Sequence, residues 1–369
     1  MPMDAKKAAT LAKLKAAFQK KFGKESVNYY GDDAPPELKR IPSQCLAIDE
    51  VTGGGYPLGR IVEIFGGESS GKTTALYHAI AAAQAKYPDR VCGFIDSEQS
   101  FDPEYARACG VKVDELMFSQ PNNGPEAFGI MQMMIESGFP LIAVDSVAAM
   151  VPREEAEEED FGKSQVGRQA AMMSRSLRKI LPVLGHSECV VIFTNQTRDA
   201  VGVMWGDPTT TPGGKALKFY ASVRLKFTKL KALEEGSGDN KQKVGVRTRV
   251  EAVKNKTFPP YRRGEFIITF GKGIDDEAAV FQAIIEMGLV GTKAGGWYTL
   301  DGQNIARGLP ALHDYYAANP AVYERLKAAL RAKTAKPPAD APVSAQADED
   351  GPDPAEDPAA GDLAETGEV

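Results

Sequence analysis

The residues best suited to chemistry lie in the segment GGESSGKT, residues 66–73. It fits the pattern G-x-x-x-x-G-K-[ST] and stands between a β-rich run at 60–65 and a helical stretch near 71–86. Glycines let backbone N–H groups surround phosphate oxygens, and the first turn of a helix adds positive potential. We therefore predict a nucleotide-binding loop in which Lys72 contacts the β- and γ-phosphates and Thr73 offers its hydroxyl to Mg²⁺. The loop residues predicted to hold the nucleotide are Gly66, Glu68, Ser69, Ser70, Gly71, Lys72, Thr73 and Thr74.

Acidic side chains follow two further β-rich runs. Asp145 lies at the end of LIAVDS, residues 141–146, and Glu98 and Asp102 follow the run that opens FIDSEQSFDPEY, residues 94–105. Ligands bind beyond the carboxyl ends of parallel strands, so these side chains are candidates for the same site. We predict that Asp145 holds Mg²⁺ through water and that Glu98 orients or deprotonates an attacking water. Helix capping is the alternative for both carboxylates, and Tyr105 is as well suited to packing as to stacking on adenine.

A long loop begins where another predicted strand ends. The run CVVIFTNQ, residues 189–196, finishes in Asn195 and Gln196, a polar pair that we expect to face the γ-phosphate. The amide of Gln196 can donate to phosphate and accept from water. Gln196 also opens a stretch without helical or strand periodicity. We therefore expect a switch segment whose order depends on the bound nucleotide.

This loop carries Val203, Met204 and Trp205 in a row, and Trp205 is one of only two tryptophans. Exposed apolar side chains of this kind can insert between bases. Cations near the loop that suit phosphate contacts are Arg198, Lys215, Lys218 and those of the helical stretch at 167–179. These features favour a nucleic acid over the two alternatives, which are a protein partner and a Trp205 side chain buried in the core.

Apolar β-rich runs alternate with helical stretches over much of the chain, a pattern typical of an α/β fold with a mostly parallel sheet between helices. Three later runs, ASVRLKFTKL, VRTRVEAVKNK and GEFIITF, predict antiparallel strands added to one edge. After Gly273, a helix, the run GWYTLDGQNIARG and a helix near 320–333 predict a small α+β domain. We place the domain boundaries at 1–38, 39–271, 272–333 and 334–369.

The N-terminal segment 1–38 predicts an amphipathic helix that ends near Gly23, because Leu11, Leu14, Phe18 and Phe22 fall at helical spacing. This apolar stripe is suited to packing on its own domain or on a neighbouring subunit. The sequence resembles no secretory signal, and no apolar run approaches the ~20 residues that a membrane helix needs.

Composition and charge narrow the class of protein. The chain has 369 residues, a net charge of −6, and four cysteines and three histidines whose spacing suggests neither zinc nor disulfides. We expect a cytoplasmic protein with reduced thiols. Residues 334–369 contain ten acids, one lysine and six prolines, which predicts a disordered tail. Such a tail either solubilises the protein or competes with a polyanion for a basic surface.

The chain resembles the bacterial RecA recombinases over almost all of residues 1–333. The segments that match in order and spacing are GGESSGKTT, FIDSEQSFDPEYA, VDSVAAMVP, IFTNQTR, GVMWGDPTTTPGGKALKFYASVRL and AVKNK. The resemblance implies a RecA-like P-loop NTPase core and a DNA-dependent ATPase with ATP and Mg²⁺ as cofactors. It also implies a head-to-tail filament on single-stranded DNA that pairs with homologous double-stranded DNA, exchanges strands and stimulates self-cleavage of the SOS repressor.

The resemblance assigns roles to individual residues. Asp102 and Tyr105 would contact the nucleoside, and Gln196 would sense the γ-phosphate. Lys254 and Lys256 in AVKNK would reach the ATP of a neighbouring subunit, as an arginine finger does in trans. A pair of exposed strand lysines is the alternative. The implied catalytic residues are Lys72, Glu98, Gln196, Lys254 and Lys256.

Two DNA-binding loops are implied at about 154–173 and 197–213. Their apolar residues would insert between base steps, their polar and basic residues would contact phosphates, and their glycines would let the chain approach DNA closely. The residues are Val166, Arg168, Ser174, Arg178, Arg198, Val203, Met204, Trp205, Gly213 and Gly214. Trp205 stands where Phe is commoner in the family, and Lys215 stands where Asn is usual.

Three other functions compete with a recombinase. A motor with the same core would close into rings, and a filament with weak exchange activity would serve mainly as a scaffold for repressor cleavage. A small-molecule kinase would need an acceptor pocket and a lid, for which the sequence shows no signature.

Overall fold

The computed structural model describes residues 4–23, 27, 38–157, 167–199, 209–236 and 240–334. The part before Arg40 is one compact unit, and the part from Arg40 onward is another. The predicted tail from residue 335 and the middle of both predicted DNA-binding loops lie outside the described residues. The candidate site residues Val166, Val203, Met204 and Trp205 lie outside them as well.

The first unit contains the helix α1 (Ala5–Phe22). Asp4 caps its N-terminus, because the side chain accepts a hydrogen bond from the backbone N–H of Lys6 at 3.0 Å. The helix ends at Gly23, whose φ of 100° lies in the region that favours glycine. The predicted N-terminal helix and its end are therefore confirmed.

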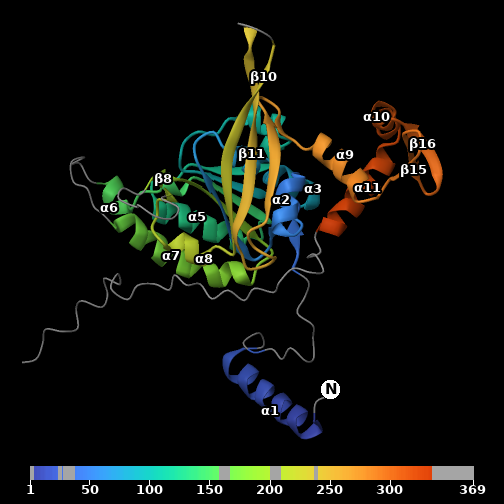
Figure 1. Ribbon diagram of the computed structural model, residues 1–369. Helices are drawn as coiled ribbons and strands as arrows, with labels where there is room; N and C mark the ends of the chain where they lie inside the picture. Colours follow the sequence, from blue (N-terminus) through green and yellow to red (C-terminus); the bar gives the residue numbers. More distant parts are fainter. Residues whose placement is uncertain are drawn as a thin grey trace, which may run out of the picture. The chain divides into compact units, whose positions relative to one another are not determined.

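The second unit is built on a nine-stranded sheet in the order β13-β12-β11-β10-β3-β7-β6-β4-β5. The long strands β10 and β11 of this sheet are labelled in Figure 1. Neighbours from β10 to β5 are parallel, and neighbours from β10 to β13 are antiparallel. This confirms a mostly parallel α/β sheet with antiparallel strands added at one side. The strands are β3 (Arg60–Gly66), β4 (Cys92–Asp96), β5 (Leu116–Ser119), β6 (Leu141–Asp145), β7 (Val190–Gln196), β10 (Val223–Glu235), β11 (Gln242–Asn255), β12 (Arg263–Thr269) and β13 (Gly273–Asp275).

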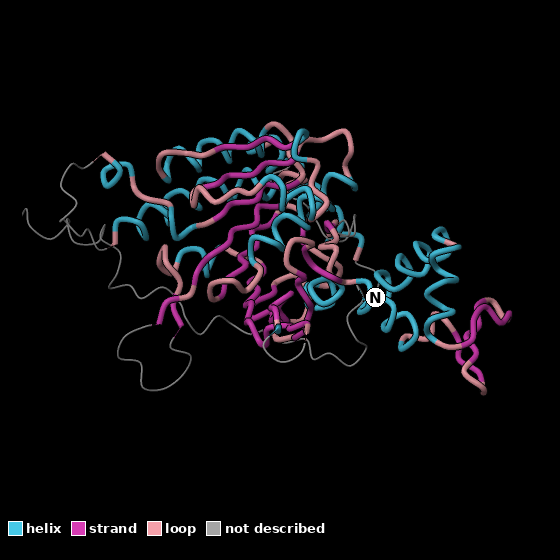
Figure 2. Tube along the Cα trace, turned by 90° about the horizontal axis from the view of Figure 1, so that it is seen from above, coloured by secondary structure: helices cyan, strands magenta, loops and turns pink. Residues whose placement is uncertain are grey.

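Helices cover both faces of this sheet (Figures 1 and 2). One face packs on α2 (Leu46–Thr52), α3 (Lys72–Lys86) and α4 (Pro103–Ala108), and the other packs on α5 (Gly124–Glu136), α7 (Arg168–Gly185) and α8 (Ala216–Tyr220). Along β3, Val62 and Ile64 join the first core and Ile61 joins the second. A strand buried on both faces is apolar at most positions, which explains the nearly continuous apolar runs.

Short elements connect these layers. The strand β1 (Arg40–Ile41) pairs with β2 (Tyr56–Pro57), and β8 (Arg198–Asp199) pairs with β9 (Thr209–Thr210). The remaining short helices are η1 (Val113–Glu115), η2 (Val147–Ala149) and α6 (Arg153–Ala156). None of the described helices is long and apolar enough to span a bilayer. The four cysteines are buried free thiols.

The C-terminal part contains a separate cluster of buried apolar residues. Its elements are α9 (Glu277–Glu286), β14 (Gly291–Lys293), β15 (Trp297–Leu300), β16 (Gln303–Arg307), α10 (Leu309–Ala318) and α11 (Pro320–Thr334). The three strands form an antiparallel sheet, and helix α10 is not among the predicted elements. Leu46 of α2 joins this core and so links it to the larger one.

A buried carboxyl group at this link predicts a pH dependence of stability. Asp276 accepts from the backbone N–H of Leu46 through both oxygens, at 2.9 and 2.8 Å. Burial raises its pKa to about 7, Asp49 adds to the rise, and Arg331 opposes it. A raised carboxyl pKa stabilises the fold when the group is protonated, and this contribution is lost as pH rises toward 7.

We expect Asp276→Asn to remove this loss, because an asparagine oxygen still accepts from Leu46 and never ionises. Urea unfolding between pH 4 and 8 measures the effect, which is on the order of 2 kcal/mol for a partly exposed group. The matched control is Asp275→Asn, an exposed neighbour that should retain the wild-type slope. Equal slopes in wild type and Asp276→Asn would contradict the prediction.

Candidate functional site

The phosphate loop spans the end of β3 at Gly66 and the start of α3 at Lys72. Gly71 precedes the helix with a φ of 91°, a conformation that side chains rarely adopt. A Cβ atom on Gly71 would lie 2.1 Å from the Ile268 side chain, and one on Gly66 would lie 2.1 Å from the backbone oxygen of Phe227. The loop therefore rests directly on β10 and β12. Glycine is required at Gly66 by this close approach to backbone and at Gly71 by its positive φ.

Gly66→Ala is expected to destabilise the protein, because backbone atoms cannot move aside as a flexible side chain can. A typical overpacked site costs about 1–3 kcal/mol, which a urea unfolding curve measured without nucleotide can resolve. Gly67→Ala is the matched control, since a Cβ on Gly67 meets nothing within 4 Å. Equal free energies of unfolding for the two variants would show that β3 can shift away from Phe227.

Lys72 lies over the loop. Its ammonium group donates to the backbone oxygens of Gly66 at 3.1 Å and Gly67 at 2.8 Å. Burial lowers the pKa of Lys72, while the nearby carboxylates of Asp145, Glu98 and Glu68 act in the opposite direction. The cation is thus held between the loop and the acidic ends of the neighbouring strands.

Asp145 ends β6 and joins three elements at the carboxyl edge of the sheet. One carboxylate oxygen accepts from the Thr73 hydroxyl at 2.6 Å, and the other accepts from the Thr194 hydroxyl. Its backbone oxygen accepts from the N–H groups of Ser97 and Glu98, at 2.7 and 3.1 Å. The side chain is only 2% exposed, so its position is fixed beside the first turn of α3. No group of three or more His, Cys, Asp and Glu side chains that could hold a metal occurs among the described residues.

Glu98 and Gln196 meet at the same edge. Gln196 Nε2 donates to Glu98 Oε1 at 3.4 Å, although Glu98 follows β4 and Gln196 is the last residue of β7. In the sheet register, Gln196 also lies opposite Gly66, the first residue of the phosphate loop. The structure therefore brings the amide, the carboxylate and the loop together, as the sequence predicts for a nucleotide site.

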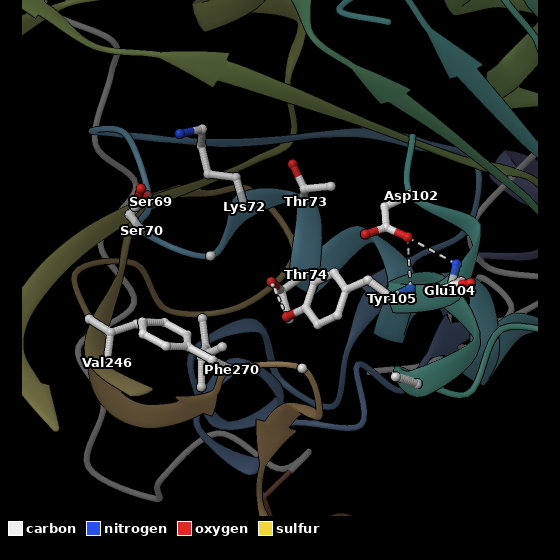
Figure 3. A pocket seen from close by; sticks show the side chains of 14 residues that line it. Ser69, Ser70, Lys72, Thr73, Thr74, Asp102, Glu104, Tyr105, Val246 and Phe270 are labelled. Carbon is white, nitrogen blue, oxygen red and sulfur yellow. Dashed lines mark hydrogen bonds between the residues drawn. The ribbon is translucent and has the colours of Figure 1, made fainter. Parts of the chain in front are cut away.

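A cavity of about 640 Å³ lies beside the loop (Figure 3). Tyr105 Oη and Thr74 Oγ1 lie 3.0 Å apart in its wall, and Asp102 caps α4 by accepting from the N–H groups of Glu104 and Tyr105. The lining residues that the sequence analysis identified are Ser69, Ser70, Gly71, Lys72, Thr73, Thr74, Asp102 and Tyr105. Those it did not identify are Glu104, Ala108, Val246, Ile268, Phe270 and Gly271. The second group includes ordinary apolar residues of β11 and β12, which carry no signal in the sequence.

Lys254 and Lys256 lie elsewhere. Lys254 is on β11, and its ammonium donates to the backbone oxygens of Lys218 at 2.7 Å and Phe219 at 3.1 Å in α8. Lys256 follows the strand, and its N–H donates to the backbone oxygen of Ser222. Neither lysine is among the described residues that line the cavity.

The predicted DNA-binding loops start and end close to the nucleotide site. Arg168, Ser174 and Arg178 lie on α7, where both arginines are exposed. Gln169 on the same helix donates to the backbone oxygens of Val147 at 3.0 Å and Met150 at 2.9 Å. Val147 and Met150 lie in the segment that follows Asp145 at the end of β6. The first turn of α7 is therefore hydrogen-bonded to the segment that leaves β6.

The second loop leaves β7 through β8 and returns through β9, which pairs with it at Arg198↔Thr210. Gly213 and Gly214 follow β9 with φ values of 85° and 71°. A Cβ atom would lie 2.9 Å from the Val147 side chain at the first glycine and 2.6 Å from Ala170 Cβ at the second. Tight packing against η2 and α7 is thus a sufficient reason for both glycines.

Asn195 does not point where the sequence analysis expects. It is fully buried, and its amide nitrogen donates to Glu63 Oε1 at 3.0 Å and to the backbone oxygen of Pro212 at 3.1 Å. The second oxygen of Glu63 accepts from Arg224 Nε. Side chains alternate between the two faces of a strand, so Asn195 and Gln196 cannot both face the phosphate loop.

Comparison with known proteins identifies the family. The family model of the RecA N-terminal domain matches residues 9–275. The chain belongs to the RecA family. Protein RecA of Nocardioides sp. is 47% identical over 314 residues, which cover 85% of this chain and 87% of that protein. Protein RecA of Frankia alni is 45% identical over 320 residues, which cover 86% and 90%. Protein RecA of Kineococcus radiotolerans is 44% identical over 335 residues, which cover 90% and 94%.

Membership of the RecA family confirms the resemblance that the sequence motifs indicated. It assigns the chain a general function in DNA recombination and repair, with binding of DNA and ATP. The RecA match includes every candidate residue of the nucleotide site and both predicted loops, since all of them lie between residues 9 and 275. The cluster of Glu63, Asn195 and Arg224 also lies in this RecA region. No local pattern in the sequence indicates this cluster, because its members are far apart in the chain.

Proposed function

We propose that the protein is a DNA-dependent ATPase that forms ATP-bound filaments on single-stranded DNA and exchanges strands with a homologous duplex. The contact of Gln196 with Glu98 carries this proposal. Gln196 lies opposite the phosphate loop and is also the last residue before the second predicted DNA-binding loop. One side chain is therefore able to report the state of the nucleotide to that loop.

Each residue at the sheet edge has a part in ATP hydrolysis. Lys72 and the N–H groups at the start of α3 hold the β- and γ-phosphates, and Glu98 orients the attacking water. Tyr105 and Asp102 contact the nucleoside in the cavity, whose opposite wall is apolar. Thr73 and Asp145 supply two oxygen ligands side by side, and this donor set fits Mg²⁺, which prefers few protein oxygens together with phosphate and water. When bound, Mg²⁺ neutralises charge on the phosphates.

DNA binding is assigned to the two loops. Arg168, Ser174 and Arg178 would contact phosphates from α7, and Arg198 would do so from the second loop. Val166 belongs to the first loop, and Val203, Met204 and Trp205 would insert between base steps from the second. Gly213 and Gly214 remain candidates for close approach to DNA in addition to their packing role. Gln169, next to the first loop, donates hydrogen bonds to Val147 and Met150, in the segment that follows Asp145. These bonds support a structural connection between the first loop and the nucleotide site.

Self-association completes the proposal. Lys254 and Lys256 would reach the ATP of a neighbouring subunit, and α1 would pack on that neighbour through its apolar stripe. Such a head-to-tail contact need not close and therefore builds a filament. We further assign to this filament the stimulation of SOS repressor self-cleavage, in the cytoplasm. Electron microscopy with ATP and single-stranded DNA tests the assembly, since closed rings would instead favour a motor.

The decisive measurement is ATP hydrolysis with and without single-stranded DNA. We expect DNA to stimulate the wild type and Trp205→Ala to lose the stimulation, because base–aromatic contacts are worth about 1–3 kcal/mol per base. Trp297→Ala is the matched control, since Trp297 is the only other tryptophan and lies on β15. If single-stranded DNA does not change the rate of ATP hydrolysis by the wild type, the proposed function is refuted.

A further inference from the structure

A cluster of buried polar side chains lies on the neighbouring strands β7, β3 and β10, close to the end of β3 where the phosphate loop begins. Glu63 and Asn195 are both 0% exposed, and the Arg224 side chain is 13% exposed. Burying a charge is costly unless it is paired and hydrogen-bonded, so the cluster needs an explanation beyond packing. No step of ATP hydrolysis proposed above uses any of the three residues.

Asn195 uses every part of its amide. The nitrogen donates to Glu63 and to the backbone oxygen of Pro212, while Oδ1 accepts from the backbone N–H of Gln196 at 3.0 Å. Gln196 immediately precedes the second predicted DNA-binding loop, and Pro212 lies at its far end. A single side chain therefore fastens the two ends of the loop to each other.

Glu63 fixes the orientation of that amide. It lies on β3, three residues before Gly66, where the register places it opposite Phe193 of β7 and Arg224 of β10. Its second oxygen is held by Arg224, whose guanidinium group also stacks over the Phe65 ring at 4.4 Å from the centroid. The carboxylate can therefore turn away from Asn195 only if the ion pair is disturbed.

We propose that Asn195, oriented by Glu63, is a positioning residue that couples the phosphate loop to the second DNA-binding loop. The inference rests on the proposed function and specifies how that site is regulated. When Gln196 changes its contact with the nucleotide, Asn195 transmits the change to Pro212, so that both ends of the loop move as one unit. DNA bound to the loop acts back on Gln196 by the same connection, because coupling between two binding sites is reciprocal.

Only an asparagine can make this set of contacts. The cluster needs two N–H donors and one acceptor on a short side chain, which serine, threonine and aspartate do not have. Aspartate would also place a second carboxylate against Glu63. This requirement allows a test in which the contact with Pro212 is removed, while a hydrogen bond between positions 63 and 195 is kept.

The test exchanges the two groups, in the double variant Glu63→Gln with Asn195→Asp. The introduced glutamine amide donates to the introduced carboxylate, and its oxygen still accepts from Arg224. The net charge is unchanged, but no donor remains for the oxygen of Pro212. In the single variant Glu63→Gln, one acceptor oxygen replaces two, so the side chain cannot accept from both Asn195 and Arg224 and no longer fixes the Asn195 amide. The control is Glu265→Gln, which alters an exposed carboxylate that accepts from Arg249 at 3.0 Å on the same sheet.

The measurement is the ratio of ATP hydrolysis with single-stranded DNA to hydrolysis without it, with kcat and KM separated. We expect the double variant to lose stimulation on the order of tenfold, within the usual range of coupling between sites, mainly through kcat. Glu63→Gln should lose part of the stimulation, because it no longer orients the Asn195 amide, whereas Glu265→Gln should retain the wild-type ratio. Wild-type stimulation in the double variant would overturn the inference, whereas a wild type that DNA does not stimulate would instead refute the proposed function.

Asn195→Ser provides a second route if the exchanged pair does not fold. Its hydroxyl adds no charge and is too short to reach both Glu63 and Pro212. We expect the same loss of stimulation, and a wild-type ratio in this folded variant would equally overturn the inference.

Discussion

Lys72→Ala is expected to reduce ATP hydrolysis by at least about 10²–10³-fold, which is the usual effect of removing one electrostatic contact to a transition state. Lys72 is the only lysine among the described residues that line the cavity. Its ammonium already lies within hydrogen-bond distance of two oxygens of the phosphate loop. Phosphoryl transfer depends mainly on such positioned charges, since the protein supplies little covalent chemistry.

The fold should survive this change, because alanine is favoured in a helix and Lys72 is the first residue of α3. Lys86→Ala is the matched control. Lys86 is the last residue of the same helix and likewise donates to a backbone oxygen, that of Arg40. A steady-state assay of both purified variants, with circular dichroism to confirm folding, decides the matter. If the rate of ATP hydrolysis by Lys72→Ala lies within tenfold of the wild-type rate, Lys72 is not a catalytic residue.

Glu63→Ala is expected to cause the largest loss of stability, about 3–5 kcal/mol, because it leaves a mostly buried arginine without its partner. The charge of Arg224 and one N–H of Asn195 would both lose their acceptor. Urea unfolding of the wild type and the variant at pH 7.5 gives the difference directly.

Two comparisons test the cause of this loss. Glu265→Ala breaks an exposed ion pair with Arg249 and should cost less than about 1 kcal/mol. Adding Arg224→Ala to Glu63→Ala should recover part of the loss, since no unpaired charge then remains. A double variant that is less stable than Glu63→Ala alone would show that the loss of packing, rather than the unpaired charge, dominates.

The loop half of the nucleotide site could be predicted from the sequence because its chemistry is local. The spacing of Gly66, Gly71, Lys72 and Thr73 within eight residues already specifies a phosphate loop, and Asp145 follows from its place after an apolar strand. These assignments agree with the geometry, in which Thr73 and Asp145 share a hydrogen bond. The roles of the residues in hydrolysis remain predictions.

The far wall of the cavity could not be predicted in this way. Val246 and Ile268 lie on β11 and β12, and Phe270 directly follows β12. All three lie more than 170 positions after the phosphate loop, and their residue types are common in any β-strand. Strand order decides their position, and the pattern of a single strand carries no information about its neighbours. The expectation for Asn195 was wrong for a simpler reason. It ignored the alternation of side chains along β7, which places Asn195 and Gln196 on opposite sides.

The position of β3 at the middle of the sheet has a consequence for synthesis on the ribosome. The partners of Glu63 lie 132 and 161 residues later in the chain, at Asn195 and Arg224. At a translation rate of about 5–20 residues per second, roughly 8–30 seconds separate Glu63 from Arg224 during elongation. The strand that carries the phosphate loop lacks both of its neighbours until β7 is made, and it lacks β10 until the end of that interval. The nascent chain must therefore shield β3 by other means, and the nucleotide site is completed only when most of the protein has left the ribosome.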